Sequence, residues 1–412
     1  MELNKAQKKI VLISSGQPSL NPRLVKEADS LTNAGYSVTV LYAYWNSWGT
    51  ALDKILLPSK KWKAVRIGGD PQEKPIVYFL SRLIHRLSVL ISKTTGIKYF
   101  TKFAIARSSF FLIREAPKYK ADLYIGHNLG ALPATLKAAK THKKPCGFDA
   151  EDFHRYEVSD DINDNDVHLK IFIENSYIPQ LNYLSSSSPG ISAAYHQLYK
   201  NQSPVTLLNV FPADNQIPVP LLTSNPVVKL FWFSQTIGQG RGVNDCIKAL
   251  QLLNNPGIEL HLLGFITEGD RQQLTAIAGD SINLIFYGPI PPDDIAALAA
   301  KFDIGLALED IVPLNRDICL TNKIFTYMQA GLAIIASNTT AQKELLEKYP
   351  GTGKVYENGN VQMLAATIRR YFDDREDLYK TKKASYELAR KELNWEKESE
   401  KFLKVISDIL PV

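Results

Sequence analysis

Cysteine is scarce in this sequence. Its 412 residues include only three cysteines, which stand far apart at Cys146, Cys246 and Cys319. No CxxC pair and no cysteine–histidine pair has the spacing of metal ligands, and an odd, scattered set does not form the disulfide framework of a small secreted protein. We therefore expect a reducing compartment for this protein and no metal site built on cysteine.

Long apolar runs are also missing. No stretch approaches the roughly 18 uncharged apolar residues of a membrane-spanning helix, so no span is expected. The polar N-terminus, residues 1–9, leads directly into a strand-like segment and does not resemble a signal peptide. These absences predict a cytoplasmic protein. The first strand-to-helix loop, SGQPSLNP at 15–22, lacks the GxGxxG fingerprint, which disfavours a nicotinamide-dependent enzyme.

Positive charge is modest overall but gathers in one place. The formal net charge is +6, and we expect no nucleic-acid partner. Between residues 81 and 120, Glu115 is the only acid among nine basic residues: Arg82, Arg86, Lys93, Lys98, Lys102, Arg107, Arg114, Lys118 and Lys120. Apolar residues interleave with them at helical spacing. Such a stretch is typical either of core-packed helices with solvated basic faces or of peripheral contact with an anionic membrane.

Composition and pattern predict an α/β protein with more than one domain. Hydrophobic residues make up 45% and charged residues 22%, as in soluble globular proteins, and 412 residues are too many for one ordinary core. Strand-like runs alternate with helical runs in both halves, which indicates parallel sheets. Strands are expected at 9–14, 36–42, 122–126, 145–149, 182–186 and 205–208, and then at 228–233, 258–263, 282–286, 303–308 and 332–336.

A segment with three prolines, NVFPADNQIPVPLLTSN at 209–225, separates the two halves. We expect a first domain over 1–209, a linker over 210–226, a second domain over 227–390 and a C-terminal helix within 391–412. Ligands of doubly wound sheets bind beyond the carboxyl ends of the strands, so a cleft between two such domains is the expected site. The architecture by itself does not name the chemistry, because it hosts many reactions.

Several motifs carry a family resemblance. In the second half they are FWFSQTIGQGRGV at 231–243, LTNKIFTYMQAGLAIIAS at 320–337 and LNWEKESEKFLKVI at 393–406. The first half matches more loosely through the segments at 16–41, 121–139 and 185–195. In order and spacing the chain resembles family 4 of the GT-B glycosyltransferases, which transfer sugars from nucleotide donors. The resemblance implies two Rossmann-like domains that face a cleft, with the C-terminal helix returning to the first domain.

The glycine-rich loop of the second half is a candidate donor site. Gly238, Gly240 and Gly242 let the backbone approach a phosphate, the following helix supplies free N–H groups, and Arg241 can clamp a diphosphate. An ordinary strand-to-helix turn is the alternative. The resemblance implies a second basic residue earlier in this loop, where Thr236 stands instead.

A second donor element begins at Asn322 and Lys323, where Thr321 is expected to cap a helix. By resemblance Lys323 stabilises the departing nucleoside diphosphate; a solvated first-turn lysine is the alternative. Thr326 occupies the place of the family's ribose-binding glutamate, and the paired upstream acid falls next to Asp317. A threonine offers fewer acceptors to a diol than a carboxylate does, so Asp317, Glu309 or Asp310 would have to substitute.

The first half supplies the acceptor side. By resemblance His127 is the catalytic histidine at the sugar, and the alternative is a structural histidine at a strand end. A carboxylate of Asp149 or Glu151, with His154, can orient or deprotonate an acceptor hydroxyl, or these residues cap a helix. Gly16 permits close approach and Arg23 can meet an acceptor phosphate. The DxD-like triplet at 164–166 follows no apolar strand and is interpreted as a solvated loop, so no metal is expected.

The resemblance implies a metal-independent transferase that retains the anomeric configuration of a nucleotide-diphosphate sugar. That co-substrate replaces any cofactor, and the acceptor is a glycan or a lipid-linked glycan. Together with the basic stretch at 81–120, the resemblance also favours a protein at the inner face of the cell membrane. Two alternatives stay open: a catalytically silent binding or scaffold protein, favoured by Thr326, and a nucleotide-sugar epimerase on the same architecture.

Overall fold

The computed structural model describes residues 7–95, 98–213, 216–223, 225–238 and 242–410. The expected site residues Gly240 and Arg241 lie outside them. The chain divides into two compact units. Unit 1 contains the residues up to Leu207 and those from Ser399 onward, and unit 2 contains Leu208–Glu398.

Unit 1 is built on a parallel sheet in which the strand order is β3-β2-β1-β4-β5-β6-β7. Buried runs of Val, Ile and Leu form the central strands, as both-sided burial requires. The strands are β1 (Lys9–Ser14), β2 (Ser37–Ala43), β3 (Lys63–Ile67), β4 (Leu123–His127), β5 (Cys146–Ala150), β6 (Tyr183–Ser186) and β7 (Val205–Thr206).

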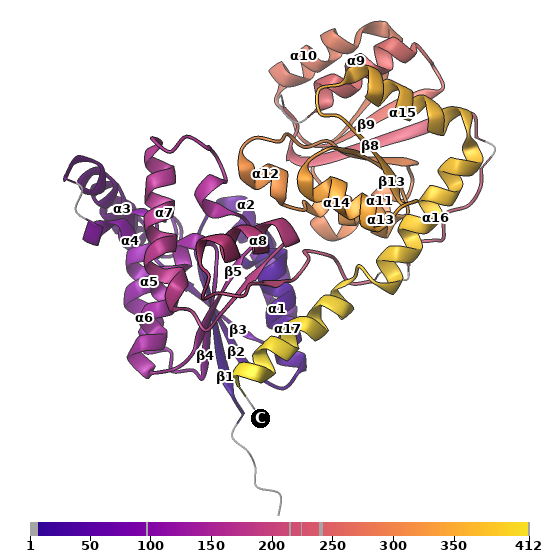
Figure 1. Ribbon diagram of the computed structural model, residues 1–412. Helices are drawn as coiled ribbons and strands as arrows, with labels where there is room; N and C mark the ends of the chain where they lie inside the picture. Colours follow the sequence, from indigo (N-terminus) through magenta and orange to yellow (C-terminus); the bar gives the residue numbers. More distant parts are fainter. Residues whose placement is uncertain (1–6, 96–97, 214–215, 224, 239–241, 411–412) are drawn as a thin grey trace, which may run out of the picture. The chain divides into compact units, whose positions relative to one another are not determined.

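Helices cover both faces of this sheet (Figure 1). The helices are α1 (Pro22–Asn33), α2 (Ser47–Leu56), α3 (Pro75–Thr95), α4 (Thr101–Ala104), α5 (Ser109–Glu115), α6 (Leu132–His142), α7 (Asn165–Tyr177) and α8 (Pro189–Leu198). On one face, Leu24 and Ala28 of α1 share a core with Ile10 and Leu12 of β1. That core also contains Phe402 from α17 (Trp395–Ile409), so the end of the chain packs on the first sheet.

Unit 2 repeats the plan, with parallel strands in the order β10-β9-β8-β11-β12-β13. The strands are β8 (Val228–Thr236), β9 (Ile258–Phe265), β10 (Asn283–Tyr287), β11 (Ile304–Ala307), β12 (Ala333–Ser337) and β13 (Gly353–Tyr356). The helices are α9 (Val243–Leu253), α10 (Glu268–Ala278), α11 (Ile295–Ala299), α12 (Leu314–Ile318), α13 (Asn322–Ala330), α14 (Thr340–Lys348), α15 (Val361–Asp373) and α16 (Arg375–Lys391). Two apolar clusters, one on each face, fill its core.

The predicted fold class is confirmed, because both units are doubly wound parallel sheets. In each sheet the order reverses at one point, between β1 and β4 and between β8 and β11. Chain crossovers leave from opposite sides of that point, so the carboxyl edge there is open to a ligand. The geometry therefore identifies two edges where function is expected.

Two local expectations are wrong. Asp164 does not belong to a plain solvated loop, because its side chain accepts a hydrogen bond from the Asp166 N–H, 2.7 Å, and caps α7. Thr321 occupies the N-cap position of α13 but makes no capping hydrogen bond. The expectation on membrane spans also needs a qualification: within the described residues, the segment Pro75–Thr94 has the length and hydropathy of a span, with 11% of its window buried.

Candidate active site

Four polar side chains line up along the carboxyl edge of the first sheet. Parallel register pairs Ser14 with His127, His127 with Asp149, and Asp149 with Ser185. Each comes from a different strand of the run β1-β4-β5-β6, and all four are buried. A continuous row of polar groups therefore crosses the topological switch point of the sheet, which lies between β1 and β4.

Asp149 is held by a guanidinium from α1. Its two carboxylate oxygens accept hydrogen bonds from Nε and Nη2 of Arg23, the second at 2.7 Å, and Oδ1 also accepts from the Ser185 hydroxyl at 2.7 Å. Both side chains of the Arg23–Asp149 pair are completely buried. Burial opposes ionisation of Asp149, but the charge of Arg23 outweighs it and lowers the pKa of the carboxyl.

This burial bears on the role expected for Arg23. Its third contact, from Nη1, goes to the Leu207 carbonyl oxygen, so the guanidinium is surrounded by protein acceptors. In the structure Arg23 organises the site from within rather than presenting its charge at the surface.

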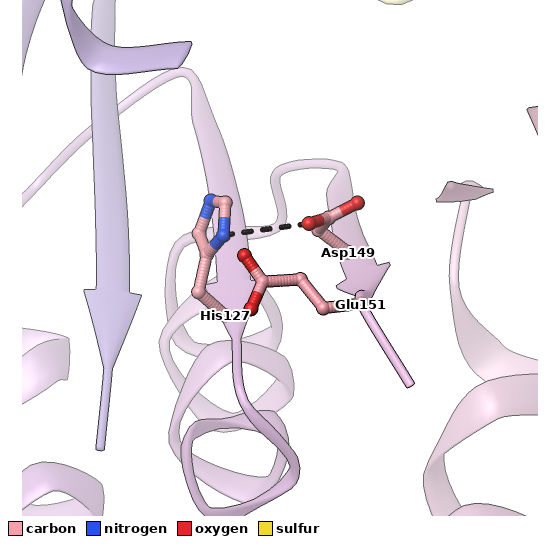
Figure 2. Close-up of side chains that lie close together, drawn as sticks. All are labelled: His127, Asp149 and Glu151. Carbon is pink, nitrogen blue, oxygen red and sulfur yellow. Dashed lines mark ion pairs between the residues drawn. The ribbon is translucent and has the colours of Figure 1, made fainter. Parts of the chain in front are cut away.

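His127 lies between two carboxylates. Its Nε2 is 3.2 Å from Oε2 of Glu27, and its Nδ1 is 3.7 Å from Oδ2 of Asp149, the ion pair drawn in Figure 2. Burial disfavours the imidazolium, but the nearby charges of Glu27 and Asp149 outweigh it and raise the pKa of His127. The site thus holds a fully buried histidine whose neighbouring carboxylates raise its pKa above the ordinary value.

Two further groups titrate near neutrality. Burial, followed by the negative charge of Asp149, raises the pKa of Glu151 to about 7. Burial and the charge of Arg23 lower the pKa of Lys26 to about 7. Figure 2 shows Glu151 reaching back beneath His127 and Asp149. An acid with a raised pKa next to a base with a lowered pKa is typical of functional sites.

His127, Asp149 and Glu151 can present ligand atoms within 4.8 Å of one another. This donor set does not suit a divalent cation, because both oxygens of Asp149 are already bonded to Arg23. A dication would also lie next to that guanidinium. The cluster therefore fits an ion network balanced by Arg23 better than a metal site.

The remaining residues of the expected acceptor side surround this network. The Gly16 N–H donates to the Ser14 hydroxyl, 3.1 Å, which in turn donates to Oδ1 of Asn128, 2.9 Å. Asn128, directly after His127, has φ 63° and ψ 142°, a positive-φ conformation that is uncommon for a residue other than glycine. His154 belongs to a different group: Nδ1 lies 3.4 Å from Oε2 of Glu157, whose charge overcomes the effect of burial and raises the pKa of His154.

The second sheet carries a buried ion pair at its carboxyl edge. Glu309 follows β11, and its carboxylate accepts a hydrogen bond from Nζ of Lys323, the second residue of α13. Both residues are 8% exposed. The Glu309 N–H donates to the Ser337 hydroxyl, 2.9 Å, and its carbonyl accepts from Nδ2 of Asn358, 2.7 Å, so neighbouring strand ends fix this position.

The start of α13 has no side-chain cap. The Thr321 hydroxyl is buried and has no hydrogen-bond partner within the described part of the chain, and Asn322 follows as the first helical residue. Lys323 extends over the ring of Trp232, with Nζ 5.8 Å from the ring centroid. Free helix N–H groups, an unused hydroxyl and an ammonium together favour an anion.

The candidate ribose-binding residues are already hydrogen-bonded. The Thr326 hydroxyl donates to the Asn322 carbonyl, 3.0 Å. The Asp317 carboxylate accepts from the Thr340 N–H and hydroxyl, 2.8 and 2.7 Å, and Asp310 pairs with Arg316 at 3.1 Å. Among the acids proposed as substitutes, Glu309 is the one in contact with Lys323.

The glycine-rich loop is described at its two ends. Thr236 ends β8 and is exposed, and a side chain at Gly238 would meet no atom within 4 Å. Gly242 precedes α9 with φ 71°, and a Cβ there would lie 2.6 Å from Cβ of Leu308. Only glycine satisfies both demands, so α9 can begin tightly against the end of β11.

The sequence analysis missed Glu27 and Lys26. Both lie on α1 close to Arg23, and Glu27 stands one helical turn after it, with its carboxylate 3.5 Å from Nε of Arg23. Charged residues one turn apart usually lie on a solvated face. Helix α1 must also cover the sheet, however. From that requirement the burial of Lys26 and Glu27 against the sheet could have been predicted.

Comparisons with known proteins identify a family match and similar folds. Residues 229–374 match the model of the family described as "Glycosyl transferases group 1". The solved structure of HepE from Anabaena in complex with UDP is similar over 98% of this chain and 100% of that one, with 15% identity and a TM-score of 0.66. A glycosyltransferase from Rickettsia africae matches over 98% and 99% of the two chains, with 14% identity and a TM-score of 0.69.

Sucrose-phosphate synthase from Thermosynechococcus elongatus is also similar, with 12% identity, a TM-score of 0.68 and coverage of 98% of this chain and 99% of that one. No curated protein matches the sequence. At such low identities the solved structures establish the fold, while the family match covers the unit that carries Lys323 and Glu309.

Proposed function

Because this chain is a glycosyltransferase of the GT-B fold whose second unit matches the group 1 family, we propose that it transfers a sugar from a nucleoside-diphosphate donor to a glycan or lipid-linked acceptor. The observation that carries the proposal is the Lys323–Glu309 pair beside the uncapped start of α13. The UDP bound to HepE supports a nucleotide ligand of this class.

The donor diphosphate binds at the start of α13. An ammonium has three N–H donors, so Lys323 can keep Glu309 and still donate to a phosphate oxygen. Helix N–H groups and the Thr321 hydroxyl add further donors. As the bond from the anomeric carbon to the diphosphate oxygen breaks, negative charge grows on the leaving group, and these fixed donors stabilise it more than they stabilise the bound donor.

The first unit binds the reacting sugar and the acceptor. His127 is fully buried between Glu27 and Asp149, which raise its pKa, so it supports from beneath the strand ends that hold the sugar. The acceptor oxygen bonds to the anomeric carbon on the face that the diphosphate leaves, which retains the configuration. Its proton passes to the departing diphosphate oxygen. Lys323 and helix N–H groups neutralise the diphosphate, so the proposal requires no metal.

A cytoplasmic location is part of the proposal. The three cysteines of the protein are free thiols, and Cys146 and Cys246 are buried. A reducing compartment keeps such thiols unpaired.

A binding protein without turnover is the second candidate. It is favoured by Thr326, whose hydroxyl is occupied by the Asn322 carbonyl and offers a ribose no free hydrogen. Such a protein binds a nucleoside diphosphate but releases none from a nucleotide sugar.

Thermal unfolding with a panel of nucleoside diphosphates tests the donor site. A ligand present at about 100 times its Kd adds about 2.7 kcal/mol of stability, which raises Tm by several degrees. We expect at least one diphosphate to do so and Lys323→Met to abolish the shift.

Lys382→Met is the matched control. Lys382 is also a partly buried lysine in an ion pair, 2.8 Å from Asp303, but Asp303 precedes β11 and lies at the opposite end of the same strand from Glu309. Lys382→Met should lower the basal Tm and keep the ligand shift. Equal ligand shifts in the wild type and Lys323→Met would show that the donor site lies elsewhere.

A further inference from the structure

Helix α3 turns its apolar side chains outward. Ile76 is 82% exposed, Phe79 66% and Leu83 53%, and the exposed stripe consists of Ile76, Phe79, Leu80, Leu83, Leu87 and Leu90. These positions recur every three or four residues and so lie along one face of the helix. The large apolar surface of α3 therefore faces away from the protein.

The opposite face of α3 is small and polar. Ser81 and Ser88 are 4% and 3% exposed, and they face the rest of unit 1 together with His85. Nε2 of His85 lies 3.0 Å from the Ala104 carbonyl oxygen at the end of α4. A helix that covers a core normally has the reverse arrangement, with leucines inside and serines outside. The sequence of α3 thus fits an apolar environment on its outer side.

Unpaired cations flank this stripe. Three of these cations, Arg82, Arg86 and Lys93, recur at helical spacing and lie along one edge of the apolar stripe, next to Leu83 and Leu90. Lys98 and Lys102 continue the positive surface after α3. Among the described residues, none of these five has a carboxylate within ion-pair distance, whereas Arg114 and Lys118 both pair with Glu115.

Aromatic rings lie next to the same surface. Tyr44 packs edge-on against Tyr78 of α3, with ring centroids 5.5 Å apart, and the guanidinium of Arg82 stacks 3.7 Å from the Tyr78 ring centroid. Trp45 is 52% exposed, and the guanidinium of Arg107 lies 5.3 Å from the centroid of its ring. Tryptophan and tyrosine beside cations are typical of the polar boundary of a membrane.

We propose that α3 and its flanking cations form a docking surface for an anionic lipid bilayer. The apolar stripe enters the boundary between headgroups and acyl chains, while the cations bind lipid phosphates. The inference goes beyond the proposed function, because it uses a surface of unit 1 and no part of the donor site in unit 2. Failure of either proposal leaves the other intact.

The helix lies in the membrane plane and does not span it. Arg82 and Arg86 occupy the middle of α3, where a spanning helix would bury both charges in hydrocarbon. Its serine face and His85 are already held by unit 1, so only the outer stripe is available to lipid. A second copy of the chain is a less suitable occupant, since two such surfaces would bring their uncompensated positive charges together.

Vesicle flotation of the full chain tests the proposal. The probes are vesicles of phosphatidylcholine alone and of phosphatidylcholine with phosphatidylglycerol, each at low and at high salt. We expect the protein to float with the anionic vesicles and to be released by salt, since cations near the surface attract anionic lipid by an amount equivalent to about fivefold in affinity per charge. Equal binding to both kinds of vesicle, or binding that resists high salt, would overturn the in-plane electrostatic model.

Paired variants identify the surface. Leu83→Asp with Leu87→Asp should reduce the partition coefficient at least about tenfold. Leu221→Asp with Leu222→Asp changes two leucines of unit 2, 78% and 60% exposed, and should leave it unchanged. Arg86→Gln with Lys93→Gln should weaken binding to anionic vesicles, whereas Lys248→Gln with Lys343→Gln should not.

Circular dichroism and Tm of each variant show that it is folded. Two outcomes contradict the proposal: the α3 variants bind vesicles as tightly as their controls, or the wild type ignores vesicles and sedimentation velocity shows a dimer that Leu83→Asp with Leu87→Asp dissociates. The second outcome would assign the stripe to a copy of the chain.

Discussion

Replacing Arg23 by methionine tests the buried network of unit 1. Methionine keeps much of the apolar length of the side chain and removes the charge. The change deletes two hydrogen bonds to Asp149 and one to the Leu207 carbonyl oxygen. It also leaves two completely buried carboxylates, Glu27 and Asp149, without their guanidinium partner.

The expected cost is large. Removing one partner of a buried ion pair costs about 3–5 kcal/mol, because the other charge stays in a medium that solvates it poorly. Against a domain stability of about 5–15 kcal/mol, such a loss destabilises unit 1 severely. Adding Asp149→Asn to Arg23→Met should restore part of the stability, because a neutral amide replaces the stranded charge.

The pH dependence follows from the pKa of Asp149. In the wild type Arg23 holds this pKa below its ordinary value, so the pair stabilises the fold above the unfolded pKa and loses that contribution as the pH falls. Without Arg23, burial raises the pKa of Asp149, and the carboxyl can take up a proton in mild acid. The penalty of Arg23→Met should therefore be smaller at about pH 5 than at about pH 8.

Urea unfolding followed by hydrogen exchange of peptides from β4 and β5 measures unit 1 separately from unit 2. Arg114→Met is the control, since Arg114 pairs with Glu115 at the surface with 54% of its side chain exposed. It should change the free energy of unfolding by less than about 1 kcal/mol. A comparably small, pH-independent effect of Arg23→Met would refute the reasoning.

Two further predictions concern neighbouring groups. Burial raises the pKa of Glu151 from its ordinary 4.5 to about 7, so this carboxyl makes the wild type less stable as the pH rises through that interval. Relative to the wild type, Glu151→Gln should therefore gain up to about 3 kcal/mol of unfolding free energy above pH 7 and little below about pH 5. Urea unfolding without such a trend would contradict this prediction. Glu27→Gln should lower the pKa of His127, measured by NMR of labelled histidine, and Glu157→Gln should instead lower that of His154; an unchanged His127 would show that Glu27 does not hold its charge.

Much of the fold was predictable from local patterns. Short Val, Ile and Leu runs such as KIVLIS at 9–14 indicate buried parallel strands, and β1 occupies those residues. The start of α9 at Val243 follows from Gly242, since its φ and its contact with Leu308 both require glycine. Strands β3 and β13 and helices α2, α7 and α14 were not predicted; in α7 the apolar residues lack a strong helical period.

The candidate site was predictable in part. Strand ends position His127 and Asp149, so a parallel sheet brings them together whatever the loops do. Glu27 and the burial of Arg23 depend on how α1 turns against that sheet, which a charge pattern does not reveal. The outward stripe of α3 was also only partly predictable. The sequence indicates an amphipathic helix, but only the packed structure shows that its serine side faces inward.

The most direct measurement of the central claim is product analysis with nucleotide sugars. The purified protein is incubated with each donor, with and without a panel of glycan and lipid-linked acceptors, and the released nucleoside diphosphate and the stereochemistry of the sugar are determined by chromatography and NMR. We predict release from at least one donor, with the sugar's ring stereochemistry unchanged, and a loss of that release in Lys323→Met but not in Lys382→Met. An epimerised sugar, or no release from any donor, would contradict the account.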